Sequence, residues 1–186
     1  MFCPEKYGPV VQALWRAGRT QPLGPGRANK EVADQLQRLT PAQLVAPRTL
    51  RDERMARLCH AALWLYHDFL EECHRISQSI ATIDGSYWHG LMHRREPDYA
   101  NAKYWFRRVG EHPVFSTLCE EARKMSQGTN HPAADFLKHR SKWDAFAFID
   151  LCNQAVRDSN LEPLCRAIQQ REWELLFDFC FNQAAE

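Results

Sequence analysis

Hydrophobic positions recur along most of the chain every three or four residues, which is the spacing of an amphipathic helix. The stretch from Val32 to Leu39 follows this spacing, and Thr40 before Pro41 then has the residue types of a helix start. No stretch combines strict alternation with β-branched residues, and no internal repeat occurs, so we predict an all-α fold. A main helix is predicted from near Thr49 to about Thr82, with an apolar stripe formed by Leu58, Ala62, Leu65, Phe69, Cys73, Ile76 and Ile80.

Capping residues and prolines divide the rest of the chain into shorter helices. Asp84 is predicted to cap a helix from about Ser86 to Arg95, which Pro97 ends. Asp98 is predicted to cap the following helix, which runs to about Val109. The pattern therefore predicts a bundle of about seven helices. Further helices are expected near 113–126, 132–140, 142–157 and 161–183.

The length of 186 residues suits one domain, which we place at 29–186 after an irregular N-terminal segment at 1–28. A net charge of +1 provides no general attraction to nucleic acid or acidic membranes. No apolar run approaches the roughly 20 residues of a membrane span. Seven cysteines without a Cys-x-x-Cys pair indicate free thiols. We therefore expect a cytoplasmic protein without nucleic-acid or membrane partners, and the apolar run at 175–181 would suit either a homodimer interface or a buried helix.

The densest group of reactive side chains lies between Tyr87 and Glu96. His89 and His93 are four residues apart, so on a helix both rings lie on one face, as in helical zinc sites. Glu96 extends the same face, and two histidines with a carboxylate are the ligands of non-haem iron or catalytic zinc sites. This pattern predicts a site for a divalent metal (Zn, Fe or Mn). The alternative is that His89 packs in the protein while His93 is solvated.

Histidines also recur every seven residues on the predicted main helix, at His60, His67 and His74. Helical geometry places them almost opposite the apolar stripe, which favours a solvated face. Apolar residues near the middle of this face indicate a second layer over it. If the helix near 86–95 is that layer, His67, Glu71 or His74 would meet its histidine pair in a site between bundle helices.

The adjacent pair His67-Asp68 resembles the metal-binding pair of the HD phosphohydrolases, which are helical proteins. The resemblance covers these two residues. Neighbouring residues on a helix point about 100° apart, so joint ligation of one ion needs special geometry. We therefore carry no phosphohydrolase activity over to this chain.

A basic and aromatic group follows the histidine pair and predicts an anion pocket beside the metal site. Arginine forks suit phosphates and carboxylates, and neutral polar groups would complete such a pocket. The charge is too dilute for a nucleic-acid surface. The alternative is internal ion pairing, for instance of an arginine with Asp98. The candidate residues are Arg94, Arg95, Asn101, Lys103, Tyr104, Arg107 and Arg108.

The stretch from Ser86 to Phe115, with its Tyr-Trp-His-Gly-Leu-Met-His-Arg-Arg-Glu-Pro-Asp and Asn-Ala-Lys-Tyr-Trp-Phe-Arg-Arg-Val-Gly-Glu-His-Pro segments, resembles an uncharacterised family of bacterial and fungal proteins. This resemblance implies no activity. The leading hypothesis is a metal-binding helical protein with chemistry of the hydrolase or oxygenase type. The alternative is a non-catalytic module that binds an anionic small molecule or a partner protein. The sequence leaves open whether the protein is an enzyme.

Overall fold

The computed structural model describes residues 2–15 and 19–186, and 69% of the chain is helical. No strand occurs within these described ranges, which confirms the predicted all-α fold. The expected count of about seven helices is wrong, because the described part of the chain contains eleven α-helices. The count is higher because there are short helices near the N-terminus and because the predicted main helix is broken into two.

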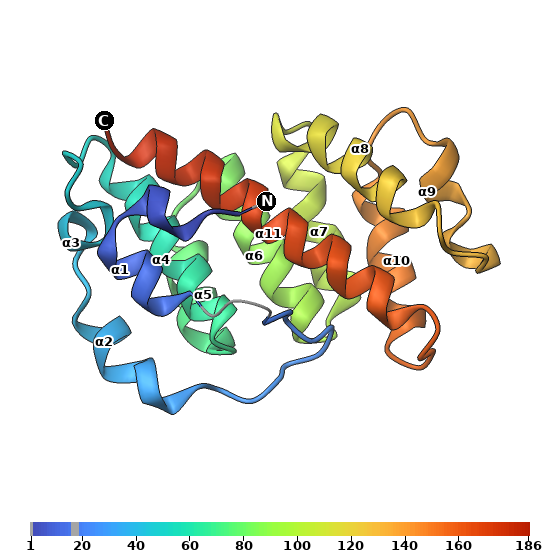
Figure 1. Ribbon diagram of the computed structural model, residues 1–186, viewed down its shortest axis with the longest axis horizontal. Coiled ribbons are helices and arrows are strands. Elements are labelled where there is room, and N and C mark those ends of the chain that lie inside the picture. The colour runs from blue at the N-terminus through green and yellow to red at the C-terminus, as the bar shows by residue number, and fades with distance from the viewer. Residues whose placement is uncertain (1, 16–18) are drawn as a thin grey trace.

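The helices form a bundle in which α6 and α7 lie between two groups, one of α1 to α5 and the other of α8 to α10 (Figure 1). The last helix, α11, runs diagonally across the bundle and packs on both α4 and α8 (Figure 1). Among the described residues, no helix has the length and apolar character needed to cross a bilayer. The bounds are α1 Pro9–Leu14, α2 Ala33–Arg38, α3 Pro41–Val45, α4 Glu53–Tyr66, α5 Leu70–Gln78, α6 Ile83–Arg95, α7 Tyr99–Val109, α8 Val114–Ser126, α9 Phe136–His139, α10 Ala145–Ala155 and α11 Glu162–Ala184.

The predicted main helix is broken between α4 and α5. Asp68, which lies in the break, has a φ of 65°, a left-handed conformation that no helix continues through. Both oxygens of its carboxylate accept hydrogen bonds, one from Arg19 and one from Arg95. These distant arginines hold the turn open, and the apolar period continues across it, so local sequence gave no sign of the break.

Two predicted caps are confirmed and one is wrong. Thr40 forms a capping box with Gln43 at the start of α3, and Asp98 accepts from the backbone of Asn101 at the start of α7. Asp84 does not cap α6, because Thr82 accepts from the Gly85 backbone and the helix begins at Ile83. A threonine hydroxyl two positions earlier is also among the favoured cap acceptors.

Helix α6 is the central element of the bundle. It packs against α5 and α7 as well as α4, and every residue from Asp84 to Arg95 is buried. Polar side chains inside this stretch therefore need partners within the protein. The two histidines and two arginines of α6 meet this need in different ways.

The segment at 1–28, expected to be irregular, contains a short 3₁₀ helix at Pro4–Tyr7 as well as α1. Tyr7, Val11 and Leu14 are buried in the core of the bundle. Residues 19–26, here called the strap, run over α6 and α11 without regular structure. The N-terminal segment is therefore part of the packed structure.

Candidate metal centre

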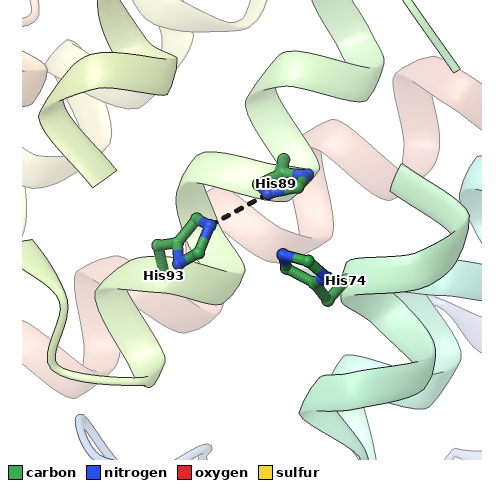
Figure 2. Close-up of side chains that lie close together, drawn as sticks. All are labelled: His74, His89 and His93. Atoms are coloured by element: carbon green, nitrogen blue, oxygen red, sulfur yellow. Dashed lines mark hydrogen bonds between the residues drawn. The ribbon is translucent and has the colours of Figure 1, made fainter. Parts of the chain in front are cut away.

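Three histidines from two facing helices converge at one point. His74 comes from α5, and His89 and His93 come from α6 (Figure 2). One ring nitrogen of each lies within 4.8 Å of the others, and no second trio of metal-ligating side chains this close was found in the described ranges. The rings point toward one another across the interface (Figure 2).

The short connection between α5 and α6 explains this convergence. Only residues 79–82 separate the two helices, so α6 folds back along α5. The His74 ring centre then lies 4.6 Å from that of His89 and 5.4 Å from that of His93. The solvated face predicted for the seven-residue histidine stripe is wrong at His67, which is fully buried. A second layer does cover the His74 end of that stripe.

The His93 ring is oriented by Glu96. Its Nδ1 lies 3.0 Å from Glu96 Oε2. An ionised carboxylate can only accept, so Nδ1 carries the proton and donates. His93 Nε2 is then left with a free lone pair that points into the cluster.

The His89 ring is oriented in the same sense by Ser77. His89 Nδ1 lies 3.3 Å from Ser77 Oγ, while that hydroxyl donates to the Cys73 carbonyl at 2.7 Å. A serine hydroxyl has one proton, so Ser77 can accept from His89 when the proton of that ring is on Nδ1. In this tautomer the lone pair of His89 Nε2 also points into the cluster.

The two Nε2 atoms of His89 and His93 face each other at 2.9 Å. Without a metal this contact is a hydrogen bond, in which the Nε2–H of His89 donates to the Nε2 lone pair of His93 (Figure 2). A metal ion bound by both nitrogens would replace that proton. Burial, together with the neighbouring His93 and His74, lowers the pKa of His89 to about 3. Burial also lowers the pKa of His93, although Glu96 offsets part of this effect. Near neutral pH the rings of His89 and His93 are therefore uncharged, which is the form that binds metals.

Asn101 of α7 covers His93. Its Nδ2 lies 3.1 Å from Nε2 and 3.4 Å from Nδ1 of that ring. An atom in the ring plane cannot approach both nitrogens this closely without overlapping Cε1, so the amide lies over the face of the ring. The contact leaves the in-plane lone pair of Nε2 available.

Trp105 of α7 covers His89, with stacked ring centres 4.0 Å apart. The guanidinium group of Arg108 lies over the Trp105 ring, 5.4 Å from its centroid. Gly90 allows the close approach of α7, because a Cβ there would lie 2.8 Å from the Phe106 ring. Sequence analysis missed the roles of Ser77, Trp105 and Gly90, since each depends on contacts between helices.

The two carboxylates predicted as ligands do not join the trio. Glu96 contacts the outer nitrogen of His93, and its side chain is 52% exposed. Glu71 lies exposed on α5. The geometry brings three histidines together, and Glu96 acts on one of them from outside.

The predicted anion-binding residues are distributed over different surfaces and do not form one pocket. Arg94 donates to Glu172 at 2.6 Å, and Arg95 donates to Asp68. The carboxylate partners of these two arginines are therefore Glu172 and Asp68, and Asp98 instead caps α7. The α7 residues lie elsewhere: Lys103 pairs with Asp150, Tyr104 is 47% exposed, and Arg107 lies over Phe146.

The His67-Asp68 pair serves the N-terminal region. His67 Nε2 lies 3.0 Å from the Leu14 carbonyl, and Asp68 pairs with Arg19 and Arg95. Both side chains are buried in these contacts. The pair therefore connects the α4–α5 turn to the chain before α2.

No protein-family model, no curated protein and no solved structure matches this chain. The resemblance of residues 86–115 to a bacterial and fungal family stays a prediction. The functional argument therefore rests on the geometry and chemistry of the side chains.

Proposed function

We propose that the protein binds one divalent transition-metal ion through His74, His89 and His93. The observation that carries the proposal is the convergence of three ring nitrogens within 4.8 Å of one another. Two of these rings have their outer nitrogens engaged by Glu96 and Ser77. Such outer contacts fix the tautomer and orientation of metal-binding histidines.

The donor set selects the class of metal. Imidazole nitrogens suit zinc, iron, copper and nickel, whereas magnesium, calcium and manganese prefer oxygen ligands. Because Glu71 and Glu96 are not in the trio, zinc and iron are better candidates than manganese. Three histidines leave a coordination position open, as in catalytic zinc sites.

The third histidine favours hydrolytic chemistry over oxygenase chemistry. Non-haem iron oxygenases typically bind iron by two histidines and one carboxylate, and no carboxylate completes this trio. A zinc ion held by His74, His89 and His93 would lower the pKa of a bound water to about 7 and so supply hydroxide as a nucleophile. Glu96 and Ser77 orient the rings of His93 and His89, and Trp105 covers one side of the site. Arg108 beside Trp105 would favour a substrate with negative charge.

Elemental analysis of protein purified without an affinity tag tests the proposal. We expect about one equivalent of zinc or iron per chain, and its loss in the double variant His89→Ala/His93→Ala. His139→Ala is the matched control, because that side chain is 75% exposed on α9. Absence of stoichiometric metal, in protein that also gains no thermal stability from added zinc or iron, would refute the proposal.

A second candidate function is the binding of an anionic small molecule without metal. A specific observation favours it: Arg94 and Arg95 are buried and retain guanidinium nitrogens without hydrogen-bond partners. Stabilisation of the protein by anions while a chelator is present would support this candidate.

A further inference from the structure

A second concave site lies where α4 and α5 meet the short helices α2 and α3, and it is here called the α4–α5 groove. Its volume is about 270 Å³, which is close to the lower end of the range for ligand sites, so a ligand that fits it is small. Pro41, Trp64 and Ile76 form its apolar part, and polar side chains form the rest. None of the three histidines of the proposed metal centre lines it.

The two arginines of the groove make no ion pair with the glutamates of their own helices. Glu53 precedes Arg57 by four residues on α4. Glu71 precedes Arg75 by the same number of residues on α5. This order favours an ion pair on a helix. Yet neither pair forms, and neither arginine pairs with another carboxylate in the described part of the chain. Both guanidinium groups are therefore available to an anionic ligand.

These guanidinium groups come from two neighbouring helices. Arg57 Nη2 donates to Ser79 Oγ at 3.1 Å, just beyond the end of α5, and this bond holds the Arg57 side chain across the helix pair. Arg75 lies exposed on α5, and its guanidinium group makes no hydrogen bond within residues 2–15 and 19–186. A phosphate group has three terminal oxygens, so it can accept from two arginines that approach from different helices.

His60 lines the groove near both arginines and offers an acceptor. Its Nε2 lies 2.8 Å from the Leu36 carbonyl oxygen, which can only accept, so Nε2 carries a proton. Burial, together with the nearby Arg75 and Arg57, lowers the pKa of His60, so the ring is uncharged near neutral pH. A neutral ring has one N–H, so Nδ1 keeps a lone pair. No described residue donates to this nitrogen.

The order of these groups along α4 indicates the chemistry of the ligand. Glu53, Arg57 and His60 follow one another at intervals of about one helical turn, so the cationic group lies between two acceptors. A carboxylate and a neutral imidazole nitrogen both accept hydrogen bonds, which hydroxyl groups can donate. A phosphate with a hydroxyl on either side of it therefore matches the groove better than an anion without hydroxyls.

We propose that the α4–α5 groove binds a small phosphorylated polyol. Arg57 and Arg75 hold its phosphate, and its hydroxyl groups donate to His60 Nδ1 and to the Glu53 carboxylate. The carbon chain of the polyol lies against the apolar part of the groove. This inference does not rest on the proposed metal centre, because the two sites share no residue.

The test is a titration with β-glycerophosphate, whose phosphate lies between two hydroxymethyl groups, followed by the imidazole signals in a carbon–proton correlation NMR spectrum. The His60 signal is identified by its absence in His60→Gln. We expect that signal to shift saturably, while the signals of His74, His89 and His93 stay in place. Movement of those three signals without a shift at His60 would place the phosphate at the metal centre and overturn the proposal. So would the absence of a saturable shift at His60.

One substitution and two further probes sharpen the test. Arg75→Gln removes an exposed guanidinium group, so we expect the fold to remain and the affinity to fall at least tenfold. Arg54→Gln is the matched control, because Arg54 is 69% exposed on α4 and does not line the groove. Glycerol should cause no shift, and inorganic phosphate should bind more weakly than the ester. Equal affinities of the two variants, or of the ester and inorganic phosphate, would contradict the proposal.

Discussion

Helix α6 has two buried polar faces that meet the cost of burial in opposite ways. On the face toward α5, His89 and His93 are uncharged, because burial lowers their pKa values. On the face toward α4 and α11, Arg94 and Arg95 stay charged, because Glu172 and Asp68 pair with them. The histidine face is therefore buried as neutral rings, and the arginine face is buried as ion pairs. A titratable ring gives up its charge when buried, whereas a guanidinium cannot and must recruit a carboxylate.

The arginine face should be the more costly of the two to break. Glu172 is fully buried and accepts from both Arg94 and Tyr87. Glu172→Ala leaves a buried guanidinium without its carboxylate, so we expect a loss of about 3–5 kcal/mol in the free energy of unfolding. Urea denaturation followed by circular dichroism measures it. The double variant Glu172→Leu/Arg94→Met should recover most of the loss, and failure to recover would show that the pair has a role beyond charge compensation.

The histidine face depends on close packing of α7. Gly90→Ala places a methyl group 2.8 Å from the Phe106 ring, so α7 must shift. We expect a loss of about 1–3 kcal/mol in unfolding free energy and weaker metal binding, because Trp105 moves with α7. Denaturation and metal titration measure the two effects. Gly128→Ala is the control, since nothing lies within 4 Å of a Cβ there. Equal behaviour of the two variants would be inconsistent with this packing.

The two faces should also differ in their response to pH. The pKa of His89 falls from 6.5 to about 3 on folding, so the unfolded chain binds the proton more tightly. In metal-free protein, the contribution of uncharged His89 to the free energy of unfolding is therefore fully present above pH 6.5 and declines as the pH falls toward 3. At pH 5 the contribution lost amounts to about 2 kcal/mol. The measurement compares unfolding free energies at pH 7.5 and pH 5 in EDTA for the original protein and His89→Gln. The variant should show the smaller decline, and identical declines would contradict the assignment.

The outer contact of His93 should have the smallest effect. Glu96→Gln keeps the size of the side chain but removes the charge that polarises the ring. We expect metal affinity to fall on the order of tenfold, with unchanged stability, because the Glu96 side chain is 52% exposed. Competition with a chromophoric chelator measures the affinity. Glu71→Gln, on the exposed side of α5, should bind metal as the original protein does. A comparable loss in Glu71→Gln would instead favour that carboxylate as a ligand.

Much of the local structure was predictable because its causes are local. The caps at Thr40 and Asp98 are hydrogen bonds within three residues, so the sequence pattern was sufficient. The start of α6 was predicted imprecisely, since two residues with suitable oxygens, Thr82 and Asp84, compete for the cap. The break at Asp68 was missed because its stabilising arginines are 49 and 27 residues away.

The sequence by itself determined that the fold is helical and that His89 and His93 share a face, because helical geometry relates residues four apart. Tertiary structure alone decided the third member of the group. His74 and Glu71 are three residues apart on α5, so spacing could not choose between them, and the packing of α6 on α5 selects His74. Tertiary structure also assigned Arg94 to Glu172, 78 residues away. Ion pairs of this kind depend on which helices meet, and no local pattern records that.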